Sequence, residues 1–250
     1  MLERRIEEAA LNAWPATRQM MLGGWILRFA DGYTKRANSV NPFGPSGGDL
    51  EASVAACERI YGERGMPPIF RLARPFAPAG LETLLERRGY RHADPVLVMH
   101  LDLADLAASS DDAGAPEDGM RETTLDEWFP VHAALAGVAP ERRALHRAIV
   151  DAIVPERLFA MRDEGGEAAA CGLGVLEDGL FGLFDLVTAP ERRGRGHGAA
   201  LVGGMLRWAR GRGASRAYLQ VTEANAPARR LYEKLGFHTL YDYWYRIPPN

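Results

Sequence analysis

Polar and apolar positions follow two spacings along the chain, and these spacings predict its helices and strands. Apolar residues three or four positions apart predict helices, and short apolar or alternating runs predict strands. In the first hundred residues the predicted helices are Leu2–Asn12, Asp49 to about Glu63, and Leu81–Arg88. The predicted strands are Gly24–Ala30, Tyr33–Val40, Ile69–Ala73 and Val96–Leu101. The dipeptide Asp31-Gly32 is expected to join the first two strands in a hairpin.

The remainder of the chain shows the same alternation. Its predicted helices are Leu125–Ala136, Pro140–Val154, Gly198 to about Arg212, and Ala226–Leu235. Its predicted strands are Leu158–Arg162, Ala168–Glu177, Leu180–Val187, Arg216–Val221 and Leu240–Ile247. Strands that alternate with helices predict an α/β or α+β fold with a mixed sheet.

One segment interrupts this alternation and divides the chain. Residues 106–119 are small, acidic and rich in Gly and Pro, and they lack the apolar side chains that would offset the entropy of ordering them. We therefore expect a first domain over residues 1–104, a linker over 105–119 and a second domain over 120–250.

The two predicted domains share a faint internal repeat. The segment from Leu84 to Tyr90 resembles the segment from Leu231 to Phe237, at an offset of 147 residues (231 − 84). The same offset superposes two predicted strands and two glycine-rich loops. A duplicated domain is therefore the preferred interpretation.

Composition narrows the classes of protein. The formal net charge is −3 and the pI is about 6.1, so nothing in the overall charge indicates a nucleic-acid partner. No apolar run approaches the length of a membrane span. The only two cysteines, Cys57 and Cys171, are too few for a disulfide framework or a cysteine zinc site. We expect a soluble cytoplasmic protein with no membrane partner, present as a monomer or homodimer.

A glycine-rich loop carries the sharpest candidate chemistry. The segment from Pro190 to Ala199 fits the pattern R-x-x-G-x-G, follows an apolar strand and opens a helix. Free N–H groups at a helix start bind anions, and glycines let a ligand approach the backbone closely. Since 28 of the 30 basic residues are Arg, the pattern alone is weak evidence, and a solvated surface turn is the alternative.

Two other motifs offer rival functions. Gly194-x-Gly196-x-x-Ala199, with Glu223 after the next strand, matches a dinucleotide-binding fingerprint, but the turn is too long and too little chain follows. Gly44-x-Ser46-x-Gly48 matches a hydrolase nucleophile elbow, but only two strands precede it. Both interpretations are disfavoured.

A second motif follows the loop at a suitable distance. The segment from Asn225 to Phe237 reads N-x-x-A-x-x-L-Y-E-K-L-G-F. Together with strand, R-x-x-G-x-G loop, helix and strand, it resembles the GNAT acetyltransferase superfamily over about residues 120–250. Through the repeat, the whole chain is similar to tandem GNAT proteins with a degenerate N-terminal copy.

The resemblance implies an N-acetyltransferase that uses acetyl-CoA as co-substrate and acts on a primary amine. It implies that Tyr232 donates a proton to the leaving sulfur and that Asp185 acts as general base, with Glu223 and Tyr218 as weaker candidates. The implied cofactor-binding residues are Leu186, Val187, Arg192, Arg193, Gly194, Arg195, Gly196, His197, Gly198 and Asn225.

The acceptor is not specified by these residues, and either a small molecule or a peptide amine fits. A polar run in the first half either lines the acceptor pocket or forms a solvent-facing sheet surface; its members are Trp25, Arg28, Tyr33, Thr34, Arg36, Asn38 and Ser39. Carboxylates in the loop of the first half predict that it binds no CoA. The histidine spacing implies no metal. A CoA-binding protein without turnover is the alternative function.

Overall fold

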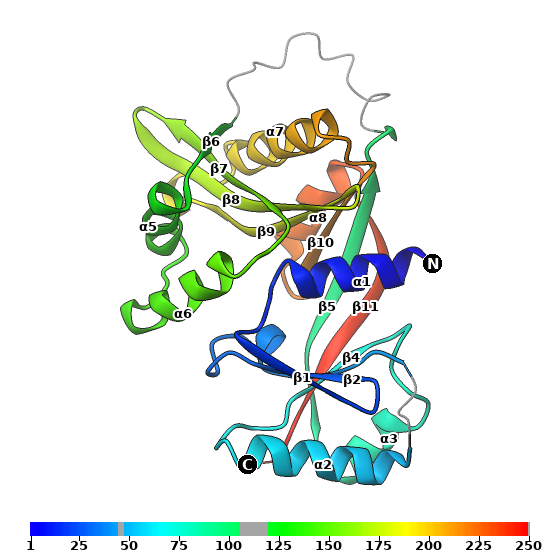
Figure 1. The fold of residues 1–250 in the computed structure, drawn as a ribbon. Coiled ribbons are helices and arrows are strands. Elements are labelled where there is room, and N and C mark those ends of the chain that lie inside the picture. Colours follow the sequence, from blue (N-terminus) through cyan, green and yellow to red (C-terminus); the bar gives the residue numbers. More distant parts are fainter. Residues whose placement is uncertain (45–47, 106–119, 250) are drawn as a thin grey trace.

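The computed structural model describes residues 1–44, 48–105 and 120–249 (Figure 1). The elements of the first half are α1 (Leu2–Asn12), β1 (Arg18–Leu22), β2 (Trp25–Phe29), β3 (Val40–Pro42), α2 (Leu50–Gly62), β4 (Phe70–Ala73), α3 (Leu81–Arg87) and β5 (Arg91–Asp102). The predicted linker, apart from Asp105, lies outside the described residues, and so does Ser46 of the nucleophile-elbow pattern.

The second half repeats the order of elements of the first half after one short strand and two helices. Its elements are β6 (Arg121–Thr123), α5 (Leu125–Leu135), α6 (Pro140–Asp151), β7 (Glu156–Glu164), β8 (Glu167–Glu177), β9 (Leu180–Thr188), α7 (His197–Gly211), β10 (Arg216–Thr222), α8 (Ala226–Lys234) and β11 (His238–Ile247). Each half therefore runs strand–strand–strand–helix–strand–helix–strand, and the expected mixed α/β fold is confirmed.

The described strands form one sheet in the order β1-β2-β3-β4-β11-β5-β10-β9-β8-β7-β6. Parallel pairing occurs only between β3 and β4 and between β9 and β10, and the other pairs are antiparallel. A dinucleotide-binding domain needs a mostly parallel, doubly wound sheet. This topology therefore excludes the dinucleotide-binding interpretation.

The last strands of the two halves are exchanged. β11, from the second half, lies between β4 and β5 of the first half, and β5 lies between β11 and β10. Figure 1 shows these two long strands running side by side from one half to the other. Neither half completes its sheet without the other, so the exchange fixes their relative position.

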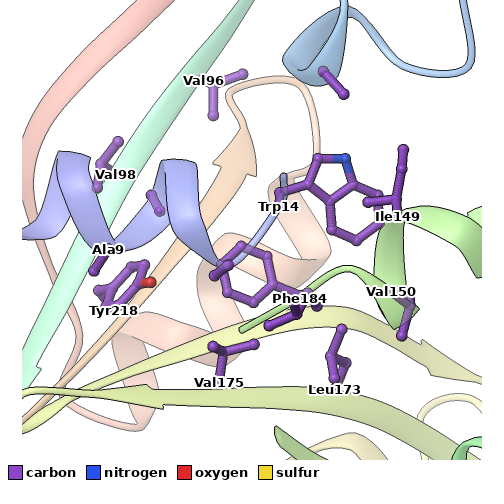
Figure 2. Close-up of a cluster of buried hydrophobic side chains, with 14 of the residues drawn as sticks. Ala9, Trp14, Val96, Val98, Ile149, Val150, Leu173, Val175, Phe184 and Tyr218 are labelled. Atoms are coloured by element: carbon purple, nitrogen blue, oxygen red, sulfur yellow. The ribbon is translucent and has the colours of Figure 1, made fainter. Parts of the chain in front are cut away.

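A hydrophobic cluster links α1 of the first half to the sheet of the second (Figure 2). Ala9 and Trp14 pack there with Phe184 and Tyr218, and the rings of Trp14 and Phe184 stack at 6.3 Å. The apolar face predicted for this helix is thus buried on the opposite half, next to the strand that carries Asp185.

The predicted hairpin at Asp31-Gly32 is wrong. Both residues have positive φ, 49° and 72°, as that type of turn requires. The chain that follows is not a strand, because the Asn38 side chain accepts hydrogen bonds from the N–H groups of Ala30 and Gly32 and holds a compact loop. The hairpin instead lies one strand earlier, where β1 pairs with β2 and Leu22 faces Trp25.

In the part of the chain that the structure describes, no helix is both long and apolar enough to cross a membrane.

Candidate functional site

Two parallel strands separate at the centre of the second half. β9 and β10 pair from Leu180 to Leu183 on β9 and from Arg216 to Leu219 on β10. Beyond Leu183 no pairing between them is present among the described residues. Parallel strands that part in this way open a cleft whose walls carry free backbone N–H and C=O groups.

A bulge in β9 causes the separation. Opposite β8 the pairing shifts so that Asp185 and Leu186 of β9 face the single residue Gly172. Asp185 has a positive φ of 47°, which reorients its side chain and turns the strand. A side chain at residue 172 would collide with Leu186, since a Cβ there would lie 2.5 Å from Leu186 Cδ2.

The glycine-rich loop ends at the start of α7, as the sequence predicts. The residue before the helix is Gly196, with a φ of 84°, and no side chain caps the first turn. The first N–H groups of a helix have no partner within it, and the helix dipole makes this end positive. The start of α7 is therefore able to bind an anion.

A cavity of about 780 Å³ lies over this helix start and the cleft. Nine of the ten residues predicted to bind the cofactor line it, and Arg195 does not. The side chain of His197 is buried, and its Nδ1 accepts a hydrogen bond from Nε of Arg162 at 3.2 Å.

The arginines of the loop differ in their partners. Arg192 donates to Glu167 at 2.5 Å and to neighbouring carbonyls, and Arg195 donates to Glu164 at 2.8 Å. The two carboxylates flank the turn between β7 and β8, so these two arginines hold the loop against that hairpin. Arg193, whose Nε donates to the carbonyl of Thr188 at 3.4 Å, forms no ion pair among the described residues.

Two further cations line the same cavity from α8. Arg230 and Lys234 stand one helical turn apart, and neither forms an ion pair among the described residues. They lie within the N-x-x-A-x-x-L-Y-E-K motif, but charged side chains at these positions are also typical of a solvent-exposed helix face. Sequence reasoning therefore missed them, although their spacing of four residues could have placed them together.

Tyr232 is buried at the inner end of this cavity. Burial raises the pKa of its hydroxyl to about 12, and the hydroxyl has no hydrogen-bond partner among the described residues. The phenol is therefore protonated across the neutral range and free to donate. Asn225 caps α8, with its Oδ1 accepting from the N–H of Ala228 at 3.2 Å. This cap fixes the start of the helix that carries Tyr232.

A second cavity of about 490 Å³ adjoins the first. Both halves line it: Trp14 and the segment Tyr33–Arg36 come from the first half, and Asp185 and Tyr232 from the second. Four residues line both cavities, namely Leu186, Asn225, Ala228 and Tyr232. The two cavities therefore meet at the tyrosine.

Asp185 has a partner that the sequence did not reveal. Nε2 of His146 lies 2.7 Å from Oδ2 of Asp185. Because a carboxylate only accepts hydrogen bonds, His146 carries a proton on Nε2 and donates it. His146 lies on α6 and is buried, with Tyr33 stacked on its ring at 5.2 Å. No motif joins residues 39 positions apart, so only the fold brings this pair together.

His132 completes a small polar cluster behind Asp185. His132, His146 and Asp185 offer ligand atoms within 4.8 Å of one another. Two ligands of a tetrahedral zinc ion lie about 3.3 Å apart, so the 2.7 Å contact is that of a hydrogen bond. Burial lowers the pKa of His132, which therefore favours its neutral form. The absence of a metal remains a prediction.

The polar run of the first half divides into two groups. Tyr33, Thr34 and Arg36 line the second cavity. Trp25, Arg28, Asn38 and Ser39 are buried elsewhere in the fold. The alternative of a solvent-facing sheet surface is therefore wrong for this run. Of the weaker base candidates, Tyr218 is buried beside Phe184, and Glu223 is exposed.

Comparisons with known proteins identify the family of the chain. A family model described as "Probable histone acetyltransferase Rv0428c C-terminal" matches residues 3–246. An uncharacterized N-acetyltransferase, YobR, of Bacillus subtilis (strain 168) is 31% identical over 245 residues, which cover 98% of each chain.

Solved structures share the fold. A GCN5-related N-acetyltransferase from Kribbella flavida has a TM-score of 0.73 and 19% identity, covering 99% of this chain and 95% of that one. A tandem GNAT protein from the clavulanic acid biosynthesis pathway has a TM-score of 0.66 and 17% identity, covering 97% and 88%.

The family model, the sequence relatives and the shared fold define the class, an N-acetyltransferase of the GNAT superfamily. Within that superfamily, the chain belongs to the family whose model is described as the C-terminal part of the probable histone acetyltransferase Rv0428c.

Proposed function

We propose that the protein transfers an acetyl group from acetyl-CoA to the primary amine of a small molecule or peptide. The observation that carries this proposal is the junction of two cavities at Tyr232. One cavity holds the features that suit a phosphate-bearing thioester, and the other holds a carboxylate base. A reaction between the two ligands would take place where the cavities meet.

The first cavity suits CoA in charge and in shape. The uncapped start of α7 offers N–H groups to a pyrophosphate. Arg193, Arg230 and Lys234 add positive charge that no carboxylate of the described residues neutralises. The cleft between β9 and β10 offers free backbone groups to an amide-bearing arm.

The acceptor amine reacts in the second cavity. Asp185 takes a proton from the ammonium group, and His146 holds the carboxylate in place through its hydrogen bond. The nitrogen lone pair attacks the thioester carbon, and the carbon–sulfur bond breaks. Tyr232 donates its proton to the departing sulfur, and the amide nitrogen releases its surplus proton to solvent, from which Tyr232 is reprotonated. Asp185 then releases the proton of the ammonium group to solvent.

A thiol-release assay tests the proposal. Purified protein is mixed with acetyl-CoA and a panel of amines, and free CoA is followed with a thiol reagent, while calorimetry measures acetyl-CoA binding. We expect acceptor-dependent release, lowered about 100-fold by Asp185→Asn. Binding of acetyl-CoA without release for any amine would support the alternative, a CoA-binding protein without turnover.

A further inference from the structure

Four charged side chains line the second cavity, and three of them already have a polar partner. Nζ of Lys35 and Oδ2 of Asp94 form an ion pair at 2.5 Å. Asp185 accepts the hydrogen bond from His146. Arg36 is the exception, because its guanidinium forms no ion pair or hydrogen bond among the described residues.

The guanidinium of Arg36 is held in place by aromatic rings. Its Cζ lies 5.4 Å from the ring centre of Trp14 and 5.8 Å from that of Phe184. Figure 2 shows these two rings next to each other. The Nε atom of Arg36 is buried without a hydrogen-bond partner. A pre-positioned guanidinium without a carboxylate is a binding group that awaits an anion.

The charged groups buried around Arg36 also favour the binding of an anion. Glu7 pairs with Arg71 and so neutralises that one residue. Among the described residues Arg28 donates only to backbone carbonyls. Burial, together with the positive charges of Arg71 and Arg36, lowers the pKa of Arg28 to about 10. This side of the cavity therefore carries more positive than negative charge, which attracts anions and repels a second cation of the acceptor.

We propose that Arg36 binds a carboxylate of the acceptor, so that the acceptor is an amino acid or another small amine that also carries a carboxylate. The amine faces Asp185 and the carboxylate faces Arg36 within one cavity of about 490 Å³. The planar guanidinium matches a carboxylate through two parallel hydrogen bonds. This inference rests on the proposed acetyl transfer, since it names the class of acceptor for the same site.

Matched pairs of acceptors test the proposal. α-, β- and γ-amino acids are compared with their amides, which keep the amine and lose the carboxylate, and with the corresponding aminophosphonates. We expect kcat/KM for the preferred amino acid to exceed that for its amide about 30-fold. Arg36→Gln should remove this preference by slowing the acid alone, and Arg36→Lys should restore part of it.

Arg18→Gln is the matched control, because Arg18 is an exposed arginine of the first half that pairs with Asp31 and does not line the second cavity. We expect it to leave the ratio of acid to amide unchanged. Equal rates for acid and amide in the unmodified protein, a preference for the phosphonate, or an equal loss for both acceptors in Arg36→Gln would each overturn the proposal.

A binding measurement separates this proposal from that of acetyl transfer. Calorimetry with CoA present measures each amino acid and amide without turnover. Binding of an amino acid that depends on Arg36, without any thiol release, would support the carboxylate site and contradict the transfer. Thiol release with amides alone would support the acetyl transfer and contradict the carboxylate site. If no amino acid is bound or acetylated, the carboxylate site is refuted.

Discussion

The starts of α2 and α7 occupy equivalent places in the two halves but have opposite chemistry. α2 begins at residue 50 and α7 at residue 197, an offset of 147 residues (197 − 50). Before α2 stands Asp49, whose carboxylate accepts from the N–H groups of Glu51 and Ala52. Before α7 stands Gly196, which has no side chain to offer.

One residue thus decides what the start of the helix binds. In the first half the anion is the protein's own carboxylate, so the N–H groups are satisfied without a ligand. In the second half the same groups stay available. The difference continues downstream at the same offset, where Pro78 and the fully buried Leu85 replace Asn225 and Tyr232. We interpret the first half as a copy that binds no CoA.

The first half still contributes to the site. It supplies β5, which completes the sheet next to β10, and the segment Tyr33–Arg36, which lines the second cavity. We therefore interpret the first half as a copy that binds no CoA and that instead forms one wall of the second cavity.

The largest expected effect comes from placing a carboxylate at the start of α7. Gly196→Glu should weaken CoA binding at least about 100-fold, because a negative charge there repels the pyrophosphate and competes for the N–H groups. Isothermal titration calorimetry with CoA measures the change. Gly196→Gln is the control, since it has the same strain at a φ of 84° without the charge. Unchanged affinity in the Glu variant would refute the pyrophosphate assignment.

The next effect is expected at Tyr232, whose counterpart in the first half is Leu85 and carries no hydroxyl. Tyr232→Phe keeps the buried ring and loses the proton donor, so kcat should fall about 100-fold while the Kd for acetyl-CoA stays within about twofold. Thiol release measures kcat and calorimetry measures Kd. A variant as active as the parent would exclude Tyr232 from the mechanism.

The sequence predicts local structure well where the pattern is strong. Leu2–Asn12 is predicted at its observed ends, because its apolar spacing is regular, and Asp49 is a recognisable cap for α2. β1 is missed because its side chains are mostly exposed and carry no alternation. β6 has only three residues, too few for a pattern to show.

The residues of the candidate site also differ in how far the sequence predicts them. The glycine loop and Tyr232 are found from the sequence because their chemistry is contained in contiguous motifs. The partnership of His146 with Asp185 arises only when distant segments meet. The sequence offers Arg36 as one member of a polar run with two alternative locations, and the fold decides that it lines the second cavity. The exchange of β5 and β11 is equally invisible, since strand order depends on the topology of the whole chain and not on any local pattern.

The smallest effect is expected at the start of α2, the counterpart of the start of α7 in the first half. Asp49→Ala removes two capping hydrogen bonds and should lower the free energy of unfolding by about 1 kcal/mol. Denaturant titration measures this loss. Asp49→Asn, which keeps a capping oxygen without the charge, should lose less.

Neither variant should create a second CoA site, because uncapping the helix does not restore the groups that Pro78 and Leu85 replace. Calorimetry should therefore still give one CoA per chain, with unchanged affinity. A second binding event in Asp49→Ala would mean that the Asp49 carboxylate alone prevents the first half from binding CoA. It would also show that the start of α2 is still able to hold the cofactor without the groups that Asn225 and Tyr232 supply in the second half.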